Sequence, residues 1–154
     1  MFYMAMVVIR RGKFYIPTVE RWGTIYYTST NPVFVGELDS SAIVAIITNL
    51  QRSGHVEHPW PEEGMKNEPR SPILKAAGVR GFKQLGDGGA EYNILYEKEQ
   101  IRLLMYHILD PAKHARSIRE KRELIFPLDT PIASIVEAIM QDAAEHPELL
   151  GDVA

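Results

Sequence analysis

The chain has 154 residues, a net charge of −3 and no cysteine. This length suits one domain with a substantial hydrophobic core, and the composition is ordinary for a soluble globular protein. The absence of cysteine excludes disulfides, thiolate catalysis and cysteine-ligated zinc, and it fits a reducing compartment. The slightly acidic balance argues against nonspecific binding of nucleic acid, which depends on dense positive charge.

The sequence contains no apolar run of membrane-spanning length. Met1 to Arg10 is apolar but too short to cross a bilayer. It also lacks the basic start and small-residue cleavage site of a signal peptide. We therefore expect a cytoplasmic protein with one domain over residues 1–154, a frayed tail at 147–154 and no membrane partner.

The first quarter of the chain alternates short β-rich runs with turn residues. The runs are Met4–Arg10, Lys13–Thr18, Thr24–Thr28 and Val33–Val35. Such a pattern predicts an antiparallel meander. Pro17 removes one backbone donor from the sheet, so we expect it at a strand end, an edge or a bulge.

Three segments carry helix start signals. Asp39, Ser40 and Ser41 offer N-caps to an apolar stretch that should end at Gly54. Ser71-Pro72 starts a short helix that Gly78 should close, and Thr130-Pro131 repeats this cap-plus-proline start. The third helix has the best amphipathic pattern, with apolar residues at Ile132, Ile135, Val136, Ile139, Met140 and Ala143.

A β-hairpin is predicted between the second and third helices. Tyr92–Tyr96 and Ile101–Ile108 alternate, and both faces of the hairpin are partly apolar, which also allows a homodimer. Lys113–Glu123 is densely charged and fits either a helix or coil. Together the elements predict an α+β fold with an antiparallel sheet of about five to six strands and two to three packed helices.

Catalytic motifs are weak in this sequence. His55, Glu57 and His58 could hold a metal ion, which makes a small metal-dependent hydrolase an alternative. However, their spacing is not the i, i+4 pattern of a helical metal site, and nearby prolines prevent a regular helix. There is no Gly-x-Ser-x-Gly motif, and the glycines at 86–89 lack a phosphate-loop context. We expect no enzyme activity, no bound metal and no cofactor.

A second alternative is a nucleic-acid-binding module. Arg116, Arg119 and Arg122 could share one face of a helix and contact phosphates. Glu120 and Glu123 interleave with them, so a solvated charged face is the better interpretation. No nucleic-acid partner is expected.

The segment from Val56 to Arg70 breaks all periodicity and is the most suggestive part of the sequence. Here Glu57, Glu62, Glu63 and Glu68 surround Trp60. A buried tryptophan anchor ringed by carboxylates suits docking onto a basic protein surface. The alternative is an ordinary surface loop whose tryptophan packs back on the core.

The chain resembles the immunity proteins of bacterial contact-dependent growth inhibition. The resemblance is carried by Val7–Thr18, by Pro32-Val33 leading to the helix at Asp39, and by Pro72–Phe82 with the strand that follows. It does not cover Asp110–Ala154, and none of its segments is a catalytic motif. The resemblance implies a small cytoplasmic antitoxin that binds one toxin domain, often a nuclease, and blocks its active site or substrate surface. We then expect Trp60 and the four glutamates around it to be toxin-binding candidates.

Overall fold

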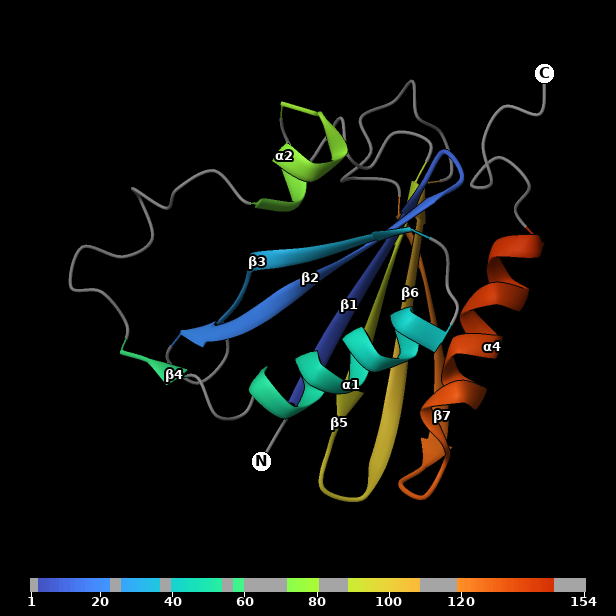
Figure 1. The fold of residues 1–154 in the computed structure, drawn as a ribbon. Helices are drawn as coiled ribbons and strands as arrows, with labels where there is room; N and C mark the ends of the chain where they lie inside the picture. Colours follow the sequence, from blue (N-terminus) through green and yellow to red (C-terminus); the bar gives the residue numbers. More distant parts are fainter. Residues whose placement is uncertain are drawn as a thin grey trace.

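A computed structural model of the chain describes residues 3–22, 26–36, 40–53, 57–59, 72–80, 89–108 and 119–145. The strands are β1 (Tyr3–Arg10), β2 (Lys13–Trp22), β3 (Tyr26–Gly36), β4 (Glu57–His58), β5 (Gly89–Tyr96), β6 (Gln100–Ile108) and β7 (Arg119–Pro127). The helices are α1 (Ser40–Ser53), α2 (Pro72–Ala77) and α4 (Ile132–Ala144). The six longer strands form one antiparallel sheet in the order β3-β2-β1-β5-β6-β7, and the two-residue β4 pairs in parallel with β2 (Figure 1). The predicted α+β class is confirmed.

The β1–β2 hairpin turns through two residues with positive φ. Arg11 has φ 49° and Gly12 has φ 77°, and Arg10 pairs directly with Lys13. Two-residue turns of this handedness match the right-handed twist of the flanking strands. The Arg-Gly pair therefore fixes the register of the first two strands.

The prediction of a turn between two short strands at residues 29–32 is wrong. One strand, β3, runs through this segment, and the pairing with β2 shifts its register between Pro17 and Thr18. Pro17 pairs with Val33, while Thr18 pairs with Thr30, so two β3 residues bulge out. The Thr18 hydroxyl donates to the Pro32 carbonyl oxygen at 2.8 Å, which ties the bulge to β2. Pro17 thus lies at a bulge, as predicted, because a bulge tolerates its missing donor.

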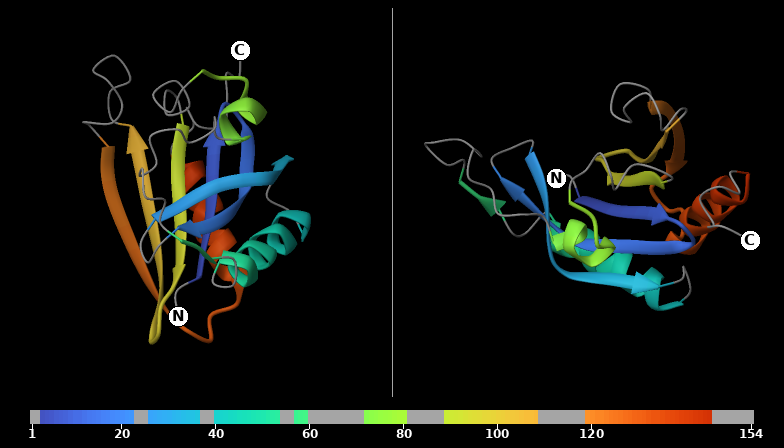
Figure 2. Two further views of the ribbon diagram at one scale, coloured as in Figure 1. Left: turned by 90° about the vertical axis from the view of Figure 1, so that its left-hand side faces the viewer. Right: turned by 90° about the horizontal axis from the view of Figure 1, so that it is seen from above.

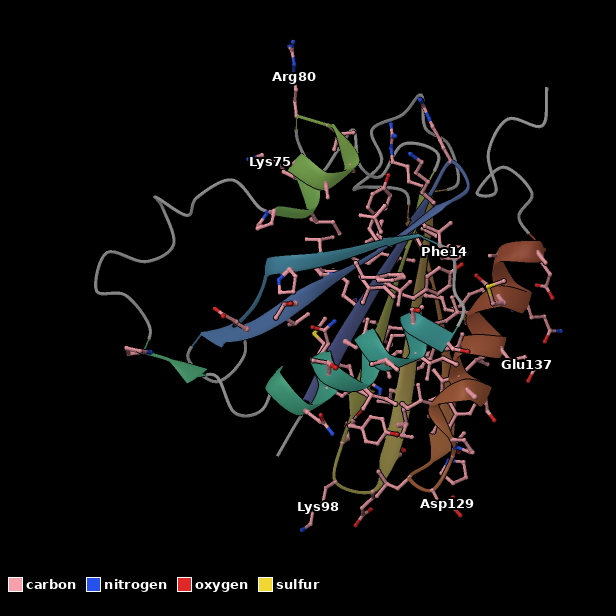
Figure 3. All side chains as sticks on the ribbon, in the orientation of Figure 1. Phe14, Lys75, Arg80, Lys98, Asp129 and Glu137 are labelled. Carbon is pink, nitrogen blue, oxygen red and sulfur yellow. The ribbon has the colours of Figure 1, made fainter. Side chains whose placement is uncertain are left out.

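One face of the sheet packs against α1 and α4, and we call it the α1/α4 face. Side chains from the middle strands fill the space between the sheet and the two helices, whereas Glu137 lies on the outer side of α4 (Figure 3). The fully buried members include Val7, Ile9, Ile46, Tyr92, Ile94, Leu103, Met105, Ile135 and Ile139. This large apolar cluster is the main hydrophobic core.

The opposite face carries α2, and we call it the α2 face. Ile73 and Leu74 of α2 and Val79 just beyond it pack on Val8 and Tyr15 in a second, smaller cluster. The helix begins at Pro72 and stops at Gly78, whose φ of 69° is the left-handed conformation of a helix end. The predicted short helix is confirmed.

Arg119–Glu123, part of the charged segment expected to form a helix or coil, belongs to strand β7. From Arg119 onward it pairs with β6 in full register, from Ile108 opposite Arg119 to Gln100 opposite Pro127. Charged side chains are common on such an edge strand because they discourage pairing with other chains. No strand periodicity is visible in the sequence of this segment, so its conformation is set by hydrogen bonding to the neighbouring strand β6.

The last helix matches its prediction in all but two details. It spans Ile132–Ala144, but Pro131 occupies the N-cap position without a side-chain cap, so the cap expected at Thr130 does not form. Met140, expected on the apolar face, is 41% exposed. No helix in the described part of the chain is long and apolar enough to cross a membrane.

Replacing Gly78 by alanine tests the left-handed stop of α2. Nothing lies within 4 Å of the position that a new Cβ would take, so the cost comes from the backbone alone. We expect Gly78→Ala to lower the free energy of unfolding by about 1–2 kcal/mol, measured by urea denaturation. Gly78→Asn should lose less, because asparagine tolerates this conformation better. Equal losses for both variants would contradict the backbone explanation.

Candidate functional site

A buried polar bridge fastens α4 to the sheet. The Tyr92 hydroxyl of β5 donates to Asp142 Oδ2 of α4 at 2.8 Å, and only 5% of Asp142 is exposed. Arg122 of β7 places its Nη1 3.3 Å from Asp142 Oδ1 and 3.8 Å from Glu145 Oε2. The bridge therefore joins β5, β7 and α4 through one carboxylate that receives both a neutral and a charged donor.

The environment of Tyr92 suits a structural donor. Burial raises the pKa of the Tyr92 hydroxyl well above its usual range, and the hydrogen bond to Asp142 raises it further. The phenol thus keeps its proton over the whole physiological range. This arrangement holds a helix in place and gives the hydroxyl no acid–base role near neutral pH.

The α2 face differs between its two halves. Helix α2 contacts β2 and β3, and no helix in the described ranges packs over β5, β6 and β7 on this side. Figure 2, left, shows this face with α2 in front of the strands and α4 behind them. We call the β5, β6 and β7 half of this face the β5–β7 patch. Among the side chains that the structure describes, the patch consists of Glu91, Asn93, Leu95, Arg102, Leu104, Tyr106, Glu123 and Ile125.

The strand register aligns these residues in rows. Asn93 lies opposite Leu104, which lies opposite Glu123, and in the next row Leu95, Arg102 and Ile125 are aligned. Directly opposed side chains on one sheet face lie close enough to contact one another. The patch therefore combines apolar and charged groups within a small area.

Arg102 is the electrostatic centre of the patch. Its Nε donates to Glu123 Oε1, and its Nη1 lies 3.2 Å from Glu97 Oε1 at the β5–β6 turn. The hydrogen bond to Glu123 raises the pKa of the guanidinium above its already high value. Two carboxylates thus neutralise one cation here. Because the pairs are partly exposed, each contributes no more than about 1 kcal/mol to stability.

Asn93 is the unusual residue of the patch. Only 9% of it is exposed, and its Nδ2 makes a long 3.4 Å contact with Glu91 Oε2. Its Oδ1 is fully buried and has no hydrogen-bond partner within the described structure. Leaving a buried acceptor unpaired costs about 1–3 kcal/mol. The described part of the fold therefore leaves this polar group unsatisfied.

Most of the predicted toxin-binding residues fall outside the described ranges. These are Trp60, Glu62, Glu63 and Glu68; they stay predictions from the sequence. Glu57 lies in β4, whose backbone pairs with Arg21 of β2.

The structure describes only part of the residue sets behind the two alternative functions. His55 lies outside the described ranges, and His58 lies in β4 opposite Trp22. In the described parts of the chain, no group of three metal-ligating side chains occurs. The predicted helical face of Arg116, Arg119 and Arg122 is wrong for the last two, since residues three apart in a strand lie on opposite faces.

The important residues that the sequence analysis missed are Asn93 and Arg102. The sequence did contain an indication of them. In the predicted hairpin, polar residues interrupt the second of its two partly apolar faces. Only the pairing of β6 with β7 places Glu123 and Ile125 beside them.

Two solved structures share this fold. One is a protein of unknown function from Neisseria meningitidis, with a TM-score of 0.59 and 11% identity over 91% of this chain and 92% of that one. The other is a chain of the CdiA-CT/CdiI toxin and immunity complex from Yersinia pseudotuberculosis. It has a TM-score of 0.58 and 8% identity over 91% of this chain and 94% of that one. No protein-family model matches the sequence, and no curated protein does. At these identities the likeness concerns the fold.

Replacing Tyr92 by phenylalanine tests the buried bridge. We expect Tyr92→Phe to lower the free energy of unfolding at pH 7 by about 1–3 kcal/mol, because Asp142 loses a buried donor. A pH series of denaturant melts adds a second measurement. In the wild type the raised pKa of Tyr92 means that the unfolded chain ionises first, so stability should fall as pH rises above about 10. Tyr92→Phe should weaken this alkaline loss, and an unchanged slope would contradict the role assigned to the buried hydroxyl.

Proposed function

We propose that the protein is a cytoplasmic immunity protein that neutralises a toxin domain by stoichiometric binding. The observation that carries the proposal is the likeness of nearly the whole fold to a chain of a toxin and immunity complex. The resemblance of the N-terminal strands and of the α2 segment to immunity proteins supports the same assignment. Such a protein needs no catalytic group of its own.

The surface of the molecule is consistent with a binding role. The β5–β7 patch presents Ile125, which is 60% exposed, beside a set of charged side chains. Exposed apolar groups within a polar rim are typical of sites that contact other proteins. The acidic loop around Trp60 supplies a second candidate contact region from the sequence.

The proposal predicts a specific partner gene and a specific rescue. We expect a large exoprotein gene directly upstream, and its C-terminal domain should be toxic when expressed alone in a bacterial cell. Co-expression of this chain should restore growth, and the two purified proteins should form a one-to-one complex by calorimetry. A neighbouring toxin domain that does not bind this chain, or an operon of metabolic enzymes, would contradict the proposal.

Charge reversal tests the acidic loop as a steering element. The variant Glu62→Lys with Glu63→Lys should slow association with the toxin domain and weaken the dependence of the rate on salt, because the attractive charges are lost. Stopped-flow association at two ionic strengths measures both effects. Glu137→Lys, on the outer side of α4, is the matched control and should leave both unchanged. Wild-type kinetics in the double variant would remove the loop from the binding site and leave the proposed function standing.

A further inference from the structure

We infer that the protein associates with a second copy of itself through the outer side of α1, as a symmetric dimer in which the two helices run antiparallel. This inference goes beyond the proposed function and does not depend on it. The surface is separate from the β5–β7 patch, because α1 packs on the opposite face of the sheet.

Four exposed residues of α1 form a narrow stripe along its outer side. The helix lies in front of the strands in Figure 1, and its inner side carries the buried residues Ala42, Ile46 and Leu50. The stripe consists of Ser40, Val44, Ile47 and Gln51. Their spacing of four, three and four residues is that of the seam along which two helices pack in a coiled coil. The stripe therefore favours a helix as its occupant.

The centre of the stripe is apolar, and α1 carries almost no charge. Val44 is 62% exposed and Ile47 is 37% exposed. A surface helix normally turns charged side chains to solvent, but in the sequence Ser40–Ser53 only Arg52, in the last turn, is charged. Because the whole chain carries a net charge of −3, two copies repel each other at a distance. An uncharged helix exterior avoids adding to this repulsion where the copies meet.

The stripe matches itself when the second copy runs in the opposite direction. With a two-fold axis midway between Val44 and Ile47, Val44 faces Ile47 of the partner subunit, and Ser40 faces Gln51 of the partner subunit. Apolar side chains then meet at the centre, and side chains that can hydrogen-bond to each other meet at both ends. The antiparallel arrangement also brings opposite ends of the two helix dipoles together. This match favours a second copy over an unrelated partner.

Thr48, beside the stripe, tolerates being covered. Its side chain is exposed, and its hydroxyl donates to the Val44 carbonyl oxygen of the same helix at 2.9 Å. A hydroxyl that already has a partner can leave water without the cost of an unpaired polar group. The second helix can therefore approach α1 on this side.

Sedimentation velocity of the purified full chain over a range of concentrations is the first test. We expect the mean mass to rise from one copy towards two. Val44→Glu should weaken the dimer by about tenfold or more, because each dimer would bury two unpaired carboxylates. Ile125→Glu, at a side chain that is 60% exposed on the other face of the sheet, is the matched control and should associate as the wild type does. A wild-type chain that stays monomeric at about 1 mM, or equal weakening by both variants, would overturn the inference.

Disulfide cross-linking tests the antiparallel register, and the chain has no native cysteine to interfere. Ser40→Cys and Gln51→Cys chains, mixed and oxidised, should cross-link to each other, because a disulfide requires Cα atoms within about 7 Å. Each variant alone should give little cross-linked dimer, since about 16 Å along the helix axis separates the two copies of either position. A mixture that cross-links no more than the single variants do would overturn the inference.

Discussion

The contact of α1 and α4 with one face of the sheet is the interaction on which the rest of the structure depends. Ile46 of α1 and Ile135 and Ile139 of α4 are fully buried against alternate residues of the strands. Burial of an aliphatic side chain of this size contributes about 1.5–3 kcal/mol, so this layer dominates stability. Because the period of a strand is two residues, the layer also fixes which side chains must point the other way.

On the opposite face of the sheet, α2 covers only part of the side chains. A helix of six residues contributes Ile73 and Leu74 to the second apolar cluster and lies over the β1–β3 half. On the β5–β7 half, Arg102 forms ion pairs with Glu97 and Glu123. Such pairs add little stability but define a charged surface of fixed geometry.

The sequence predicted the elements whose signals are local. The hairpin of β5 and β6, the starts of α2 at Pro72 and of α4 just after Pro131, and the stop at Gly78 follow from short motifs of a few residues. The conformations of β3 and β7 could not be predicted from local motifs. Pairing with a neighbouring strand overrides the turn residues at Asn31-Pro32 and the dense charge after Arg119. The β5–β7 patch could not be predicted for the same reason, since it forms only when β7 pairs with β6 and no local motif predicts that pairing.

Two adjacent residues of β5 illustrate how the two faces of the sheet differ in the way they treat a buried polar group. Tyr92 points to the α1/α4 face, where Asp142 accepts a hydrogen bond from its hydroxyl, so the chain itself satisfies this buried polar group. Asn93 points to the α2 face, where its Oδ1 is equally buried and no described residue donates to it. A leucine at this position would remove the cost, and stabilising substitutions of that kind are readily available to proteins. The described structure thus satisfies the buried polar group on one face of the sheet and leaves the one on the other face unpaired.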